Sequence, residues 1–405
     1  MAITSTQPSD SFNWPIDSDK ADPAYALEYL NNPEHFPSFS SGLTELISKY
    51  GYKGRPDHTD DKTRFLLSKL SEAEISITRS TVLDWFREKR RPNSSSESRE
   101  HMFHVCFALS VSPADMEWFF GRVYFDRTFN CHTVEEAVYD YCLTHKLPYR
   151  HAEKLIAVIR AFPDPKAPSG SGTVFTKDII HSLKRCETDE ELLRFFKHNK
   201  HIFHQWNQTA MKYINGFDKL IRGKKSDKAV INACKAGKTF LPKEVRQCGL
   251  IVQEYLLAAR GGRFDYISGK SIDSVDFMLE RMITLNSGLS RQAPVPLFVK
   301  RNFPSKKTFS DILNRCGSST SYDSIRKCLI LLKFYHFWAT LLLQPDLIDH
   351  SPFDIYCDET NALLAECGYE DLFLGNPYDW LFLWASACKK PLDALRGVIS
   401  SIDSA

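Results

Sequence analysis

The sequence lacks long apolar runs: none reaches the ~20 residues that an α-helix needs to cross a bilayer, so no membrane-spanning segment is predicted. Its eleven cysteines are scattered singly, without a Cys-x-x-Cys pair or a histidine at zinc-binding spacing. That distribution excludes a recognisable zinc site and favours reduced, buried thiols over a disulfide framework. The first residues also lack the basic start and apolar core of a signal peptide. We therefore expect a cytoplasmic protein without a metal site.

Catalytic and cofactor motifs are missing too. Residues 232–239 end in Gly-Lys-Thr, as a phosphate-binding loop does, but Asn232 stands where such a loop needs its first glycine. His198, His201 and His204 recur every three residues, with no acid or cysteine nearby to complete a metal site. No Gly-x-Ser-x-Gly sequence and no Cys/His pair at a recognisable spacing appears. We therefore predict no enzyme activity and no cofactor.

An excess of one charge is also absent, because 52 Lys and Arg stand against 50 Asp and Glu, a formal net charge of +2. Any nucleic-acid-binding surface must then be a local patch. What the chain has in abundance is apolar surface, with 28 Phe, 16 Tyr and 7 Trp among 405 residues. That length and composition favour two or three domains, each with its own core.

Apolar residues recur at spacings of three and four along most of the chain, which predicts an all-α fold. In the N-terminal part, helices are predicted over residues 24–30, 40–50, 60–73, 78–88, 99–109, 130–145 and 149–159. Further along, they are predicted over residues 176–186, 189–198, 207–222, 243–260, 274–285, 322–343, 376–387 and 391–402.

The most informative stretch is residues 77–93, which reads ITRSTVLDWFREKRRPN. Thr78 is placed to cap a helix, because its hydroxyl can accept a free backbone N–H of the first turn. Val82, Trp85 and Phe86 form one apolar stripe, and Pro92 ends the helix. Off the stripe or at the C-terminal end lie Arg79, Ser80, Thr81, Asp84, Arg87, Lys89, Arg90 and Arg91.

This stretch resembles the recognition helix of the Cro-and-repressor (XRE) type of helix-turn-helix proteins, whose pattern runs roughly V-S-R-S-T-I-x-x-W-x-x-G-K-R-x-P. The residues that match are Arg79, Ser80, Thr81, Val82, Trp85, Lys89, Arg90 and Pro92. Farther on, residues 108–112 read ALSVS, similar to the A-L-G-V-S of these proteins, so the resemblance covers residues 40–120. The chain departs from the family at Glu88 and Ser110, where the family carries glycine.

The resemblance implies a bacterial or mobile-element transcription regulator that binds double-stranded DNA sequence-specifically. It assigns the reading of base edges in the major groove to Arg79, Ser80, Thr81 and Asp84, with Arg87 on the same DNA-binding surface. It assigns phosphate contacts to Lys89, Arg90 and Arg91. Because one such module buries only ~600–1,000 Å², specific binding implies a homo-oligomer or a partner protein, held through the C-terminal helices.

A stretch rich in Pro, Gly and Ser at residues 163–172 marks the clearest linker. We therefore divide the chain into a loosely ordered acidic arm (1–38), a helix-turn-helix domain (39–160), a linker (161–173), a basic helical domain (174–293) and a C-terminal helical domain (294–405). The part after the linker resembles only uncharacterised bacterial helix-turn-helix proteins. The acidic arm either covers the recognition helix when DNA is absent or is an ordinary solvated terminus.

Basic residues also gather between residues 212 and 246, where a phosphate backbone is one partner that would fit them. The residues concerned are Arg222, Lys224, Lys225 and Lys228. Two other functions stay open on the sequence. One is a non-catalytic interaction or scaffold subunit of a larger complex, and the other is a non-specific nucleic-acid-binding subunit that uses residues 212–246.

Overall fold

The computed structural model describes residues 22–89, 91–92, 96–127, 129, 133–163, 181–203, 207–222, 311–312, 322–343 and 351–404. These residues form helices and the turns between them, with no β-strand among them, so the predicted all-α fold is confirmed. None of the helices in this part combines the length and the hydropathy that crossing a bilayer requires. The helices predicted over 243–260 and 274–285 lie outside the described residues.

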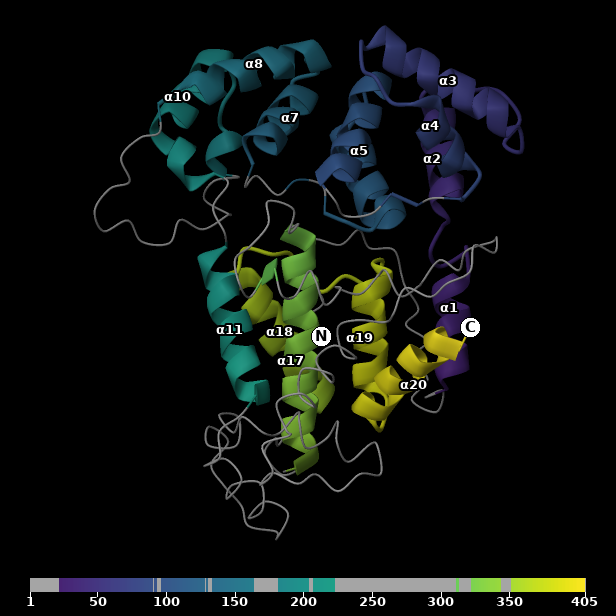
Figure 1. The fold of residues 1–405 in the computed structure, drawn as a ribbon, viewed down its shortest axis with the longest axis vertical. Coiled ribbons are helices and arrows are strands. Elements are labelled where there is room, and N and C mark those ends of the chain that lie inside the picture. The colour runs from purple at the N-terminus through teal and green to yellow at the C-terminus, as the bar shows by residue number, and fades with distance from the viewer. Residues whose placement is uncertain are drawn as a thin grey trace.

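One group of helices, which we call the N-terminal unit, shares a core that runs from Phe39 to Phe203 and occupies the upper half of Figure 1. Its helices are α2 (Phe39–Lys49), α3 (Thr59–Glu72), α4 (Arg79–Phe86), α5 (Ser96–Leu109), α6 (Pro113–Trp118), the π-helix η1 (Phe119–Tyr124), α7 (Val134–Thr144), α8 (Tyr149–Ala161), α10 (Asp189–Asn199) and the 3-10 helix η2 (Lys200–Ile202).

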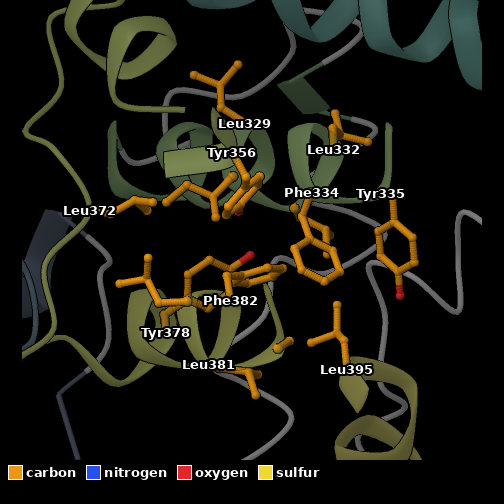
Figure 2. Packing of buried hydrophobic residues seen from close by; sticks show 14 of the residues in the cluster. Leu329, Leu332, Phe334, Tyr335, Tyr356, Leu372, Tyr378, Leu381, Phe382 and Leu395 are labelled. Carbon is orange, nitrogen blue, oxygen red and sulfur yellow. The ribbon is translucent and has the colours of Figure 1, made fainter. Parts of the chain in front are cut away.

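The second group, which we call the C-terminal unit, has a separate core below the first in Figure 1. Its helices are α1 (Pro23–Asn31), α11 (Gln208–Arg222), α17 (Tyr322–Leu343), α18 (Pro352–Glu366), α19 (Pro377–Ala387) and α20 (Pro391–Ser404). Aromatic rings and leucine side chains of this core pack against one another (Figure 2). The ring of Phe334 stands edge-on to those of Tyr356 and Phe382, with centroid distances of 5.8 and 5.2 Å.

The helix predicted near residues 24–30 is present as α1, but it is not part of a loose arm. Ala26 and Leu30 are 0% exposed, and the ring of Tyr29 stacks on Trp380 of α19 with centroids 4.4 Å apart. The apolar stripe of α1 is thus covered by α19 and α20, because it continues the core of the C-terminal unit. The prediction of a loosely ordered arm does not hold for residues 22–38, and α1 lies away from α4 (Figure 1).

The N-terminal unit extends beyond the boundary predicted at residue 160. Phe196 of α10 is 0% exposed in its core, and Phe203 follows it there. The carboxylate of Asp189 also accepts hydrogen bonds from the Tyr141 hydroxyl at 3.0 Å and from the ring of His151 at 2.8 Å. The predicted linker therefore joins two parts of one unit, since the same core lies on both sides of it. Most of that linker, and the predicted split between residues 293 and 294, lies outside the described residues.

The two units meet at the end of η1. Phe125 has a left-handed backbone (φ 62°) and points its ring into the core of the C-terminal unit, 5.9 Å from the ring of Phe36. The side-chain amide of Asn376, which caps α19, donates to the Phe125 carbonyl at 3.1 Å. One residue of the N-terminal unit is therefore built into the second core.

Candidate nucleic-acid interface

The candidate interface is α4, which lies against α2 and α3 in the N-terminal unit (Figure 1). The helix begins as predicted, because the hydroxyl of Thr78 accepts the backbone N–H of Thr81 at 3.3 Å. It ends at Phe86, two residues before the predicted end. The reason is a turn at Glu88, whose backbone is left-handed (φ 56°). This turn directs the N–H of Lys89 back toward the carbonyl of Asp84 in α4.

Left-handed turns occur at both positions where the XRE pattern has glycine and this chain does not. Glu88 has φ 56° and Ser110, after α5, has φ 52°. After Glu88, the N–H of Lys89 bonds the carbonyl of Asp84 at 3.1 Å, which closes the end of α4. The backbone at both positions is therefore the one that glycine adopts without a steric cost.

Glycine at these positions is expected to stabilise the fold. Glu88→Gly and Ser110→Gly should each raise the free energy of unfolding by about 0.5–1 kcal/mol, because a Cβ in this conformation costs ~1–2 kcal/mol and the added freedom of the unfolded chain offsets only part of that. Urea denaturation followed by circular dichroism measures the change. Lys154→Gly, at an exposed position inside α8, is the control and should lose about 0.5–1 kcal/mol. Equal losses at all three positions would contradict the assigned backbone.

The inner face of α4 is the predicted apolar stripe. Val82, Trp85 and Phe86 are 0%, 2% and 4% exposed, so that prediction is confirmed. The ring of Trp85 meets the ring of Phe39 edge-on at 6.0 Å, and the carbonyl of Phe86 accepts the hydroxyl of Ser40 at 3.0 Å. These contacts fix the rotation of α4 about its axis, and with it the face that points outward.

The outward face follows from the helical period. At about 100° per residue, the positions opposite the buried stripe are 80, 84 and 87. Ser80 and Arg87 are exposed and Asp84 is half-buried. Within the part of the chain that the structure describes, neither Asp84 nor Arg87 has a side-chain hydrogen bond or ion pair. The centre of this face is thus open and holds one acid and one base.

Two other predicted base-reading residues lie at the edges of the outward face. The guanidinium of Arg79, whose side chain is 69% exposed, is 3.4 Å from the carboxylate of Asp60 in the first turn of α3. The hydroxyl of Thr81 lies 2.8 Å from the capping hydroxyl of Thr78. Arg79 is therefore free to leave a weak exposed ion pair, whereas Thr81 belongs to the cap.

The three residues predicted to contact phosphates, Lys89, Arg90 and Arg91, differ in their surroundings. Lys89 is exposed, and Arg90 lies outside the described residues. Arg91 is turned inward: its guanidinium lies 4.2 Å from the centroid of the Phe125 ring and donates to the carbonyl of Val123. An aromatic face and an open carbonyl at the end of η1 attract this cation. Arg91 is half-buried and ties the segment after α4 to η1, so contact with a phosphate would compete with these interactions.

The surface around α4 is not uniformly basic. Acidic and basic residues are nearly equal in number along residues 39–89. Asp60 and Asp61 lie in the first turn of α3, beside Arg79, and Glu88 precedes Lys89. A general attraction to phosphates is consequently weak at this face, and affinity for a duplex must come mainly from specific contacts.

The second predicted basic site is largely outside the described residues. Arg222 ends α11, and nothing is described for Lys224, Lys225 and Lys228. Among the residues that are described, no group of three or more His, Cys, Asp or Glu side chains is arranged to hold a metal ion. The described cysteines are free and buried, and burial raises the pKa of the Cys357 thiol to about 12.

Sequence reasoning missed a buried ionic network beside the junction of the units. The guanidinium of Arg99 donates to both carboxylate oxygens of Glu136, at 2.6 and 3.0 Å, and to Asp126 at 2.9 Å. Burial raises the pKa of Asp126 to about 6, against the attraction of Arg99. The partners are 27 and 37 residues away from Arg99 in sequence, so no local pattern predicts the network.

The chain matches no family model, no curated protein and no solved structure. The XRE resemblance therefore depends on the sequence matches in residues 79–92 and 108–112 alone.

Proposed function

We propose that this protein binds double-stranded DNA sequence-specifically through α4, as a transcription regulator of a bacterium or mobile element. The observation that supports this most is the two-sided character of α4. Its apolar side is locked into the core by Val82, Trp85 and Phe86, while a short polar side stays open to solvent. A helix held in this way presents fixed donors and acceptors, which base reading in a groove requires.

The dimensions and side chains of α4 suit the major groove. An α-helix with its side chains is about 10–12 Å across, and the major groove is about 12 Å wide, so α4 can lie in it. Arg79 and Arg87 stand at the two ends of the helix, each able to donate two hydrogen bonds to a guanine. Lys89, beyond the left-handed turn, is placed to contact a phosphate. Because acids balance the surrounding bases, the proposal predicts low affinity for random duplexes.

Arg87→Ala tests the proposal. Duplexes are first selected from a random pool with the full chain, and affinities are then measured by fluorescence anisotropy at two salt concentrations. We expect the variant to lose about 1–3 kcal/mol on the selected duplex, while its affinity for an unrelated duplex barely changes. Arg194→Ala is the matched control, because Arg194 is exposed on α10, on the other side of the N-terminal unit (Figure 1).

Two outcomes would contradict the proposal. In one, the full chain enriches no duplex above the starting pool. In the other, Arg87→Ala and Arg194→Ala weaken binding equally, which would indicate a general attraction between charges in place of base reading.

The second candidate is a non-catalytic interaction subunit whose α4 contacts protein. The balance of charges around α4 favours it, because the rim of a protein–protein interface is polar and does not require an excess of positive charge. In that case a partner protein should co-purify with the full chain and be released by Arg87→Ala, with no duplex enriched. A homo-oligomer held by the C-terminal unit fits either candidate.

A further inference from the structure

Asp84 is an acid at the centre of the face that is proposed to meet DNA. It lies one turn after Ser80 and one turn before Arg87, opposite the buried stripe of α4. Its carboxylate has no hydrogen bond or ion pair within the described part of the chain, although Arg87 is three residues away. Within that part of the chain, this carboxylate is therefore free to meet a ligand.

A carboxylate at this place restricts what can lie opposite it. Binding of α4 in the groove of a duplex removes water from the carboxylate of Asp84. This desolvation is costly unless a hydrogen-bond donor of the DNA replaces the water. Phosphates offer only acceptors, and so do the major-groove edges of guanine and thymine. The only donors there are the amino groups of cytosine and adenine.

Cytosine suits the carboxylate better than adenine. The adenine amino group lies between two acceptors, its own N7 and the O4 of the paired thymine, and both repel a carboxylate. The cytosine amino group has one acceptor beside it, the O6 of the paired guanine, while the other side is the apolar C5 edge. The electrostatic cost of approach is therefore lower at a C·G pair.

We infer that Asp84 is a specificity-determining residue and that the bound duplex carries a cytosine whose amino group donates to its carboxylate. This inference rests on the proposed function and deepens it, because it names one base of the target. Asp84 also limits binding to random sequence, since guanine or thymine opposite it would leave its charge without a donor, and adenine would place an acceptor on each side of the donor.

The inference is tested by a change of base preference. Asp84→Asn keeps the size of the side chain but adds a donor, and a carboxamide pairs with both the amino group and the N7 of adenine. Selection of duplexes with wild type and with Asp84→Asn should give sites that differ at one position, cytosine for the wild type and adenine for the variant. At that position each protein should prefer its own base by about tenfold to a hundredfold.

Two further variants complete the design. Asp84→Ala should lose the preference for cytosine at that position without gaining a preference for another base. This variant tests the carboxylate independently if Asp84→Asn does not fold. Glu153→Gln, an exposed acid on α8, removes the same charge elsewhere and should leave the selected site unchanged. Thermal melting of each variant confirms that it is folded.

The outcomes separate the inference from the proposed function. If the wild type enriches a site that depends on Arg87, but Asp84→Asn and Asp84→Ala select the same bases as the wild type, then the role of Asp84 is overturned and DNA binding stands. If the wild type enriches no duplex at all, both are overturned.

Discussion

Replacing Arg99 by methionine is expected to destabilise the protein by about 3–5 kcal/mol, because the change leaves two buried carboxylates without their counter-ion. Arg99 is 6% exposed, and it is the shared partner of Glu136 and Asp126. Methionine fills much of the same volume, so the loss reports the unpaired charges more than a cavity. Urea denaturation at pH 7, followed by circular dichroism, measures it.

The destabilisation should shrink as the pH falls. Even with Arg99 present, burial raises the pKa of Asp126 from its ordinary value of 3.8 to about 6. The folded state therefore holds this proton more tightly than the unfolded state. Asp126 contributes its full stabilisation below pH 3.8 and loses it as the pH rises through about 6. Without the guanidinium, the pKa of Asp126 rises further, because the attraction of Arg99 no longer opposes the effect of burial. The difference between wild type and Arg99→Met should then be largest at pH 7 and smaller at pH 5.

The triple variant Arg99→Met, Asp126→Asn, Glu136→Gln is the control, because it removes all three charges of this network and should recover most of the lost stability. Arg79→Met removes an exposed ion pair and should change stability little. A loss at Arg99 no larger than the loss at Arg79, or a triple variant less stable than the single one, would contradict the buried network. The single variant should also loosen the junction of the units, since Asp126 directly follows Phe125.

Much of α4 could be predicted from the sequence because its determinants are local. A capping hydroxyl at Thr78 and apolar residues at positions 82, 85 and 86 act within a few residues, and the structure has both. The left-handed turn after the helix was harder to predict from the sequence. Glu88 carries no sign of that backbone by itself, and only the comparison with a glycine-bearing pattern points to it.

What the sequence could not reveal is which distant surfaces meet. The stripe of α1 predicts a helix, but the same stripe would serve a helix docked on either unit, and the structure docks it on α19 and α20. Arg91 appears in the sequence as one more cation at a helix end. Its partner, the ring of Phe125, comes to it only through the path of α5, α6 and η1. The extent of the N-terminal unit was hidden for the same reason, because α10 joins its core after a stretch that reads as a linker.

The central claim is that the outward face of α4 meets a DNA duplex, and Ser80→Glu separates binding from folding at that face. Ser80 is exposed, small and in the first turn of α4. A negative charge at a helix N-terminus is stabilising by about 0.3–1 kcal/mol, so the variant should melt no lower than the wild type. The same charge would lie against phosphates and base acceptors in the complex, where a juxtaposition of like charges costs several kcal/mol.

The measurement is the affinity of Ser80→Glu for the duplex selected by the wild type, with melting temperature recorded on the same samples. Ala157→Glu, which adds the same charge at an exposed position on α8, is the control and should bind as the wild type does. We expect Ser80→Glu to lose at least about a hundredfold in affinity at an unchanged or higher melting temperature. Binding as tight as that of the wild type would contradict the claim that α4 faces the duplex.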